Sequence, residues 1–241
     1  SFLKARRCSP APALPHLRLA SLDYLPEGGD PGTVSVERAL RLSGPDSLAQ
    51  LLAAQLAVQF RDLGLASRAW RTAIETSDTT WAEVAVASGM VLSPDQILHQ
   101  VLPPGGRNAL RFADCLFAAP RDREIRDRFL RTAIERLPDD PELTPAERLW
   151  IGAQAMARLD DRARARRQMS AALAAEPFRE GWREEFVGWL IAWGDPEEAC
   201  RQARIGLNLS PNHAGLGNGL KSASEAFARR IPKAAGPPAR E

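Results

Sequence analysis

The chain has 241 residues, 44% hydrophobic and 26% charged, so it can bury a substantial core in one elongated domain or two compact ones. Its 32 basic and 30 acidic residues leave a net charge of +2, which argues against a dedicated nucleic-acid-binding protein, because such proteins carry a marked basic excess. The cysteines are few and far apart, so the sequence offers no CxxC pair for a zinc knuckle or a thioredoxin-like site.

The first 34 residues are rich in proline. They contain five prolines and the sequence EGGDPG, a density that disfavours both helices and central strands. We therefore expect residues 1–34 to form an extended arm or linker, with some of its leucines packed along the following domain. The opening SFLKARR fits two interpretations, the trailing edge of a removed membrane helix or a loop. Within the sequence itself, no apolar run reaches the ~18 residues that span a bilayer.

From residue 35 onward the sequence predicts one helix after another. No stretch alternates as a half-buried strand does, and breakers recur at intervals typical of helix lengths. Helix starts are marked clearly. Ser93 and Asp195 each precede a proline, and Thr144 precedes one with Glu147 three residues later, which is the pattern of a capping box.

A repeat is clearest in the last third of the chain. Residues 146–179 and 180–213 align without gaps at a period of 34 residues, and each copy reads as a helix, a turn, a second helix and a proline. Small residues stand where the two helices would cross, because close helices need small side chains there. These residues are Ala165 and Ala172 in the first copy and Ala199, Ala203 and Gly206 in the second.

The pattern continues upstream with a defect. The pentapeptide RTAIE occurs at 71–75 and again at 131–135, late in a second helix each time. The two copies are 60 residues apart rather than 68, so one intervening helix pair, at 79–102, must be short. Downstream, residues 214–231 carry one apolar stripe and predict a solvated cap helix, followed by a disordered tail at 232–241.

This organisation resembles the tetratricopeptide-repeat (TPR) family, strongly over 146–213 and more loosely over 47–138. The resemblance implies an all-α, right-handed superhelix of about five antiparallel helix pairs plus a C-terminal capping helix, spanning residues 35–231. The chain departs from the family pattern at the short pair. Early in the first helix, where the family usually has a large aromatic residue, one repeat has Leu149 and the next has Arg183.

The resemblance further implies a non-enzymatic scaffold that binds a protein or peptide segment in the concave groove lined by first helices. Trp150 is the expected exposed anchor of that groove. The positions that the family register places in the groove are Leu51, Gln55, Gln59, Arg111, Cys115, Trp150, Gln154, Arg158, Glu184, Gly188 and Ile191.

A second interpretation belongs to a different class. A string of degenerate helix pairs after a membrane segment resembles the soluble tail of bacterial O-antigen-ligase-like membrane proteins. The chain would then be an accessory domain that positions an acceptor or partner while catalysis happens elsewhere. It would lie in the cytoplasm or periplasm, tethered upstream of Ser1. Hydrophobic segments upstream in the full-length protein would decide between the two interpretations.

Residues for chemistry are scarce. His16, His99 and His213 fall in the arm, a helix and a turn, and no HExxH, GxSxG or Walker motif occurs. We therefore expect no enzyme activity, no cofactor and no metal site. The expected partner is a protein or peptide segment and not a nucleic acid, with no membrane span in this stretch, and a monomer is favoured.

Two further clusters each leave an alternative open. The arginines at 162, 164, 166 and 167 predict a solvated outer face. The alternative is a basic patch that binds an acidic partner or an anionic membrane. Trp182, Trp189 and Trp193 lie around a single helix. This spread favours a helix buried on several sides over an aromatic ligand cage.

Overall fold

The computed structural model describes residues 13–21, 32–44, 46–116 and 123–229, and every regular element within these ranges is a helix. The described chain separates into two compact units, Ser1–Asp139 and Asp140–Glu241. The predicted tail at 232–241 and much of the predicted arm lie outside the described residues.

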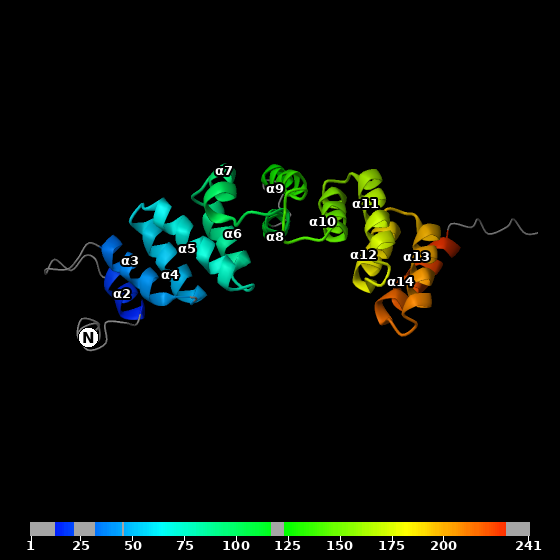
Figure 1. The fold of residues 1–241 in the computed structure, drawn as a ribbon, viewed down its shortest axis with the longest axis horizontal. Helices are drawn as coiled ribbons and strands as arrows, with labels where there is room; N and C mark the ends of the chain where they lie inside the picture. Colours follow the sequence, from blue (N-terminus) through cyan, green and yellow to red (C-terminus); the bar gives the residue numbers. More distant parts are fainter. Residues whose placement is uncertain (1–12, 22–31, 45, 117–122, 230–241) are drawn as a thin grey trace, which may run out of the picture. The chain divides into compact units, whose positions relative to one another are not determined.

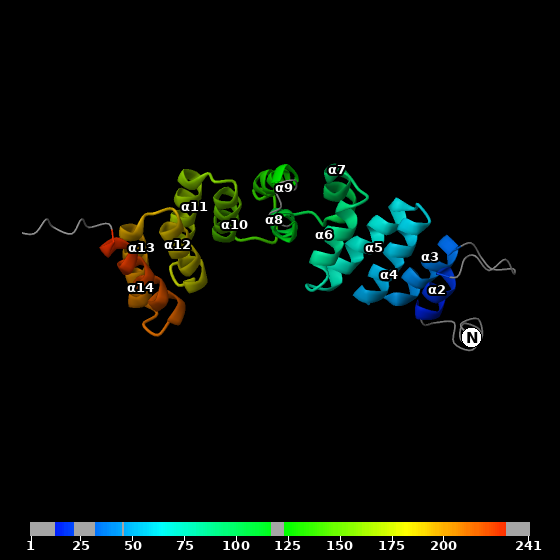
Figure 2. The ribbon, with the colours of Figure 1, turned by 180° about the vertical axis from the view of Figure 1, so that it is seen from behind.

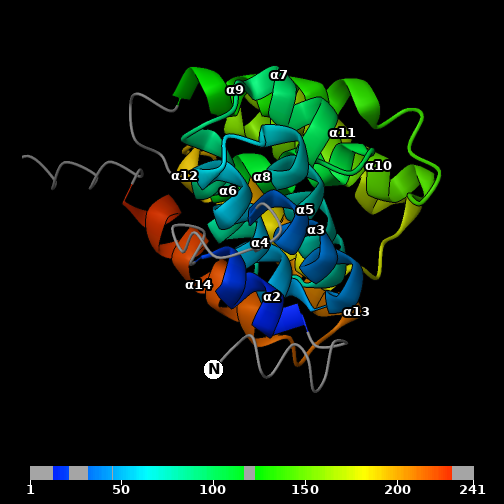
Figure 3. The same ribbon diagram turned by 90° about the vertical axis from the view of Figure 1, so that its left-hand side faces the viewer.

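The arm is not wholly extended as predicted, because α2 (Ala13–Ala20) lies inside it. Pro15 stands in the first turn of α2, where backbone N–H groups have no acceptor within the helix, so a proline costs little there. His16, Leu17 and Ala20 are buried. They belong to a helix that packs against α3 (Gly32–Ser43) and α4 (Ser47–Gln59) (Figure 3).

The first unit continues as helix hairpins. Helix α4 pairs with α5 (Leu63–Thr76), and α8 (Gly106–Cys115) pairs with α9 (Arg123–Arg136) (Figure 1). Between them lies the predicted short pair, made of α6 (Trp81–Gly89), α7 (Pro94–Gln96) and the π-helix η1 (Ile97–Val101). Helix α6 has 9 residues against 13 in α4, which confirms the shortened pair.

The second unit contains the two clear repeats. Helices α10 (Pro145–Arg158) and α11 (Arg162–Ala175) form one hairpin, and α12 (Glu180–Ala192) and α13 (Pro196–Leu209) form the next (Figure 2). The crossing residues Ala165, Ala172, Ala199 and Ala203 are 0% exposed. A Cβ atom added at Gly206 would lie 2.7 Å from Cδ of Arg183 on the paired helix α12, so the register predicted for these crossings agrees with the packing.

The predicted helix starts are also present. The hydroxyl of Thr144 accepts a hydrogen bond from the Glu147 backbone N–H at 3.2 Å, and the Thr144 N–H donates to the Glu147 carboxylate at 2.9 Å. Ser93 and Gln96 form a second capping box before α7. Such caps satisfy backbone donors that the helix itself leaves without acceptors.

Three hairpins share one turn geometry that sequence reasoning did not identify. In each, a residue with positive φ follows the first helix and an aspartate follows that residue. The left-handed residues are Arg61, Asp160 and Gly194. The next backbone N–H closes the turn by donating to a carbonyl five residues earlier, as in Asp161 N to Met156 O at 2.9 Å. The same aspartate then caps the second helix, so one residue ends one helix and starts the next.

The last helix, α14 (Ala214–Ala228), packs against both α12 and α13. Leu216 and Ala223 on its inner side are buried, whereas Lys221 and Glu225 are exposed. Phe227, predicted in the same apolar stripe, remains 40% exposed. The helix thus covers the final hairpin with a largely polar outer side.

Arg183 occupies the position where the family usually has an aromatic residue, and it is only 4% exposed. Its guanidinium donates to the Gln202 side chain at 2.7 Å and to the Pro177 carbonyl at 3.4 Å. Burial lowers the pKa of Arg183, because desolvation disfavours its charged form. The aliphatic part of this side chain packs against α13, since a Cβ added at Gly206 would lie 2.7 Å from Arg183 Cδ.

Candidate functional site

The predicted groove residues divide between the two units, with α4 and α8 in the first and α10 and α12 in the second. On α4, Leu51 is half-buried while Gln55 and Gln59 are exposed. The exposed side of α4 also carries Leu48, 70% exposed, and Leu52, 43% exposed. This helix therefore presents a mixed surface of leucines and amides.

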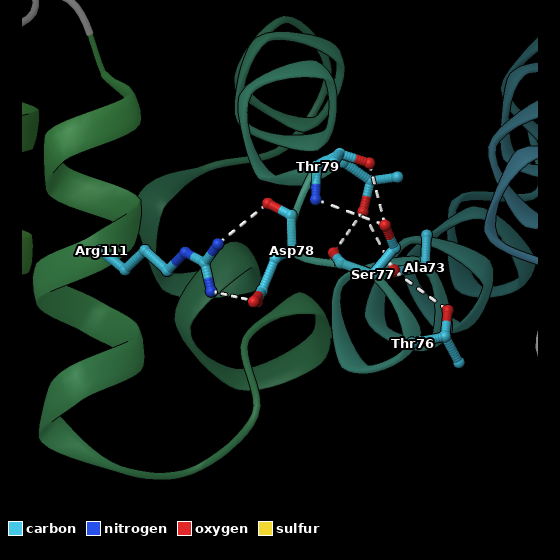
Figure 4. Close-up of polar contacts among 7 residues, drawn as sticks. Ala73, Thr76, Ser77, Asp78, Thr79 and Arg111 are labelled. Atoms are coloured by element: carbon cyan, nitrogen blue, oxygen red, sulfur yellow. Dashed lines mark hydrogen bonds and ion pairs between the residues drawn. The ribbon is translucent and has the colours of Figure 1, made fainter.

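Arg111 is already engaged within the chain. Its guanidinium donates to the Asp78 carboxylate at 2.6 Å and to the Asp78 backbone carbonyl at 2.9 Å (Figure 4). It also lies over the Trp81 ring, 4.6 Å from the centroid. Neighbouring hydroxyls bind the same turn, since Thr80 Oγ1 donates to the Ala73 carbonyl at 3.0 Å. Arg111 thus ties α8 to the turn before α6, and this was not foreseen from its groove register.

Cys115, the next predicted groove residue on α8, lines a pocket of about 510 Å³. The pocket lies among α6, α7, η1, α8 and α9. Its deepest side chains, all apolar and buried, are Ala85, Leu92, Ile97, Phe112 and Phe129. Phe112 and Phe129 pack together, with ring centroids 4.9 Å apart. Apart from the thiol, the lining contains no polar side chain.

The exposed edge of this pocket is apolar as well. Val86 in the last turn of α6 is 49% exposed, and Met90, which caps the end of α6, is 75% exposed. They continue the pocket lining onto the surface of the helix. Adjacent apolar side chains that remain open to solvent beside an apolar concavity are typical of ligand or partner sites.

The short helix pair explains why the pocket is open. The two first helices that frame it, α6 and α8, have 9 and 10 residues, whereas α10 has 14. Short first helices supply fewer side chains to cover the helices behind them. Ile97 and Phe129, both buried, line the concavity at this point.

The electrostatics of the pocket follow from its lining. Burial raises the pKa of the Cys115 thiol, and the carboxylates of Asp114 and Glu83 act in the same direction, while Arg111 opposes them. A thiol with a raised pKa is a poor nucleophile at neutral pH.

In the second unit, Trp150, the expected groove anchor, is half-buried and already has partners within the chain. Its ring is half-buried and stacks on Trp182, with centroids 5.0 Å apart. Its Nε1–H donates to the Glu185 carboxylate at 2.9 Å, and Gln154 donates to the same carboxylate at 2.8 Å. Glu185 on α12 therefore holds two predicted groove residues of α10 against the next hairpin.

The remaining predicted groove residues are distributed over two helices. Arg158 at the end of α10 is exposed, and so are Glu184 and Gly188 on α12. A Cβ added at Gly188 would meet no atom within 4 Å, so this stretch of α12 is open. Ile191 is half-buried and packs against the core of the unit. The structure thus places a solvent-accessible surface on this part of α12.

The arginine-rich face of α11 is largely neutralised within the chain. Arg162 pairs with Asp160 at 2.8 Å, Arg164 with Asp161 at 2.5 Å, and Arg166 with Asp195 at 2.7 Å. These pairs favour the solvated outer face over a patch that binds an acidic partner. The Trp182 helix packs into the core, as expected for a helix buried on several sides.

Among the described residues, no group of three or more His, Cys, Asp or Glu side chains has a metal-binding arrangement. Within the same ranges, no helix has the length and hydrophobicity to cross a bilayer. Sequence reasoning missed the pocket residues Val86, Met90, Ile125 and Phe129. The one feature of the sequence that could have pointed to these residues is the short helix pair, because its helix α6 carries apolar residues on the exposed side.

No protein-family model and no curated protein matches the chain. Among solved structures, it is similar to YrrB, described as a TPR protein with an unusual peptide-binding site, at 14% identity and a TM-score of 0.41, covering 92% of this chain and 98% of that one. It is similar to yeast Tom70 at 14% identity and a TM-score of 0.45, covering 94% and 49%. A third similar structure is the C-terminal part of a TPR repeat-containing protein from Cytophaga hutchinsonii. It has 12% identity and a TM-score of 0.38, and the match covers 91% of this chain and 92% of that one.

The hairpins themselves define the class. Two helix pairs at a 34-residue period, with alanines at the buried crossings and a helix covering the last pair, make this an all-α protein with TPR-like helical repeats. The superhelical course of the whole array remains a prediction.

Proposed function

We propose that the chain is a non-enzymatic scaffold that binds a protein or peptide segment, and that the pocket among α6, α7, η1, α8 and α9 receives apolar side chains of that segment. One observation carries the proposal. The pocket has a buried apolar floor, and Val86 and Met90 at its edge remain exposed to solvent. Transfer of an apolar side chain from water into such a pocket is favourable by ~25 cal/mol per Å² of buried area.

The size of the pocket agrees with this role. At about 510 Å³ it lies within the range of ligand sites, so it has room for one or two large side chains of an extended segment. Its framing helices come from two successive hairpins. Side chains from two repeats would therefore share one bound segment, which is how helical-repeat proteins use their first helices.

The test uses the whole chain and a phage-displayed library of random twelve-residue peptides. Peptides selected on the wild type should lose binding to Val86→Glu and Met90→Glu. Both side chains are substantially exposed, so these changes should leave the thermal melt nearly unchanged. Leu48→Glu is the matched control, because Leu48 is 70% exposed on α4 and outside the pocket lining. Binding lost in Leu48→Glu and kept in the pocket variants would place the site on α4.

The accessory-domain alternative remains a separate prediction. It requires hydrophobic segments upstream of Ser1 in the full-length protein. A peptide-binding pocket is compatible with that arrangement, since an accessory domain also needs a partner. The peptide experiment therefore tests binding, whereas the upstream sequence tests the membrane tether.

A further inference from the structure

We infer that the segment bound in this pocket carries a lysine or arginine one to three residues from its apolar anchor, and that Glu83 pairs with that cation. This inference rests on the proposed function of the pocket. It adds the chemistry of the partner, which the apolar lining alone does not specify.

Glu83 lies on the same side of α6 as the two apolar residues at the pocket edge. Glu83, Val86 and Met90 are three and seven residues apart on α6, which puts them within roughly 60° of one another around the helix. All three are exposed. The exposed side of α6 therefore presents one carboxylate in line with the two apolar side chains at the pocket edge.

The spacing along the helix sets the spacing in the partner. At 1.5 Å per residue, Glu83 lies ~4.5 Å along the axis from Val86 and ~10.5 Å from Met90. An extended peptide rises ~3.3 Å per residue. One to three residues therefore separate an anchor at the pocket edge from a cation at Glu83.

The charges around the pocket favour a cation. Glu83 forms no ion pair or hydrogen bond with another described residue, so its carboxylate is available. Two arginines near the pocket are already paired, Arg111 with Asp78 and Arg128 with Asp95. A positive group that enters beside Glu83 therefore meets one exposed carboxylate that no described residue pairs.

The experiment repeats the peptide selection on the wild type, Glu83→Gln and Glu83→Lys. Each protein also carries Cys8→Ser and Cys200→Ser, so that Cys115 is the remaining thiol. We expect the wild type to select a large apolar residue with Lys or Arg within three positions. Glu83→Lys should select the same apolar residue with Asp or Glu instead, and Glu83→Gln should show no charge preference.

A direct measurement locates the bound peptide. A selected peptide should slow alkylation of Cys115 by N-ethylmaleimide, because the thiol lines the pocket. Replacing the cation of that peptide by glutamate should weaken wild-type binding roughly fivefold at low salt and less at high salt, since exposed ion pairs are weak and screened.

The outcomes separate the two claims. Selection of an apolar residue with no charge preference, unchanged in Glu83→Lys, overturns this inference and leaves the proposed function intact. Peptides that bind equally well to Val86→Glu, or that bind without protecting Cys115, overturn the proposed function and this inference with it.

Discussion

The rings of Trp150 and Trp182 lie nearly parallel, 15° apart in plane and 5.0 Å between centroids, and this stack joins the first helices of two successive hairpins. Trp182 is 7% exposed, so the contact belongs to the core between repeats. A side chain that the register assigns to the groove thus contributes to the cohesion of the array.

Trp150→Ala should therefore lower the free energy of unfolding by about 2 kcal/mol, because it removes a half-buried ring and a donor to Glu185. Urea unfolding followed by circular dichroism measures the change. Trp150→Phe is the matched control, since it keeps a stacked ring and loses only the hydrogen bond. If the alanine variant lost less than about 0.5 kcal/mol of unfolding free energy, Trp150 would be a groove residue rather than part of the core.

Ala172→Trp tests the helix register. Ala172 is 0% exposed at the crossing of α10 and α11, and overpacking of a tight contact typically costs ~1–3 kcal/mol. The neighbouring Ala171 is exposed, so Ala171→Trp introduces the same ring outside the crossing. The melting temperature should fall in the first variant only. Equal melting temperatures would show that the crossing is elsewhere.

Arg61→Gly should stabilise the chain by about 0.5–1 kcal/mol. Arg61 has a φ of 60° and is exposed, so a residue that tolerates left-handed backbone removes strain without removing packing. Gly194→Ala, at a φ of 76° in the equivalent turn, is the reciprocal change and should destabilise. Chemical unfolding of both variants checks the signs, and a destabilised Arg61→Gly would contradict the shared turn geometry.

Arg111→Ala should cost about 1 kcal/mol of stability, because it removes an exposed ion pair and a cation–π contact with Trp81. Arg111→Lys keeps the charge and loses the paired hydrogen bonds, so it should recover only part of the loss. Thermal melts of the two variants measure this difference. Full stability in Arg111→Ala would mean that the contact with Asp78 is incidental.

The pH dependence of stability should report the cap at Asp161. The backbone N–H of Arg164, then the Arg164 side chain, lowers the pKa of this carboxyl below its usual value. A depressed acid pKa gives stability that is present above the unfolded pKa of ~3.9 and lost as the pH falls through the lower folded value. Asp161→Asn removes this titration and keeps a capping oxygen. Melts between pH 5 and 3 should therefore fall less steeply in the variant, and parallel curves would exclude the contribution.

The hairpins could be predicted because their determinants are local in the sequence. Alanines recur at the helix crossings, and caps such as Thr144 with Glu147 mark where helices begin. The helix α2 was missed because the prediction used the density of prolines and not their positions. Pro15 lies in the first turn of a helix, where proline is tolerated.

The site was harder to predict because it depends on distant partners. Arg111 reaches a turn residue 33 positions earlier, and Trp150 reaches a carboxylate 35 positions later. A register names the side of a helix on which such a residue lies, but not whether another side chain already binds it. The pocket at Cys115 arises from what two short helices leave uncovered, which no single residue encodes.

The three-residue turns within three of the hairpins also limit how this chain can change over evolutionary time. Each turn is fixed by one left-handed residue and one aspartate that serves both helices. One inserted residue would rotate the second helix by ~100° and carry residues such as Ala165 and Ala172 out of the crossing. The links between hairpins lack this turn geometry and differ in length, with four residues between α11 and α12 and eight between α9 and α10. Insertions and deletions should therefore accumulate between hairpins, and whole hairpins should be gained or lost as units.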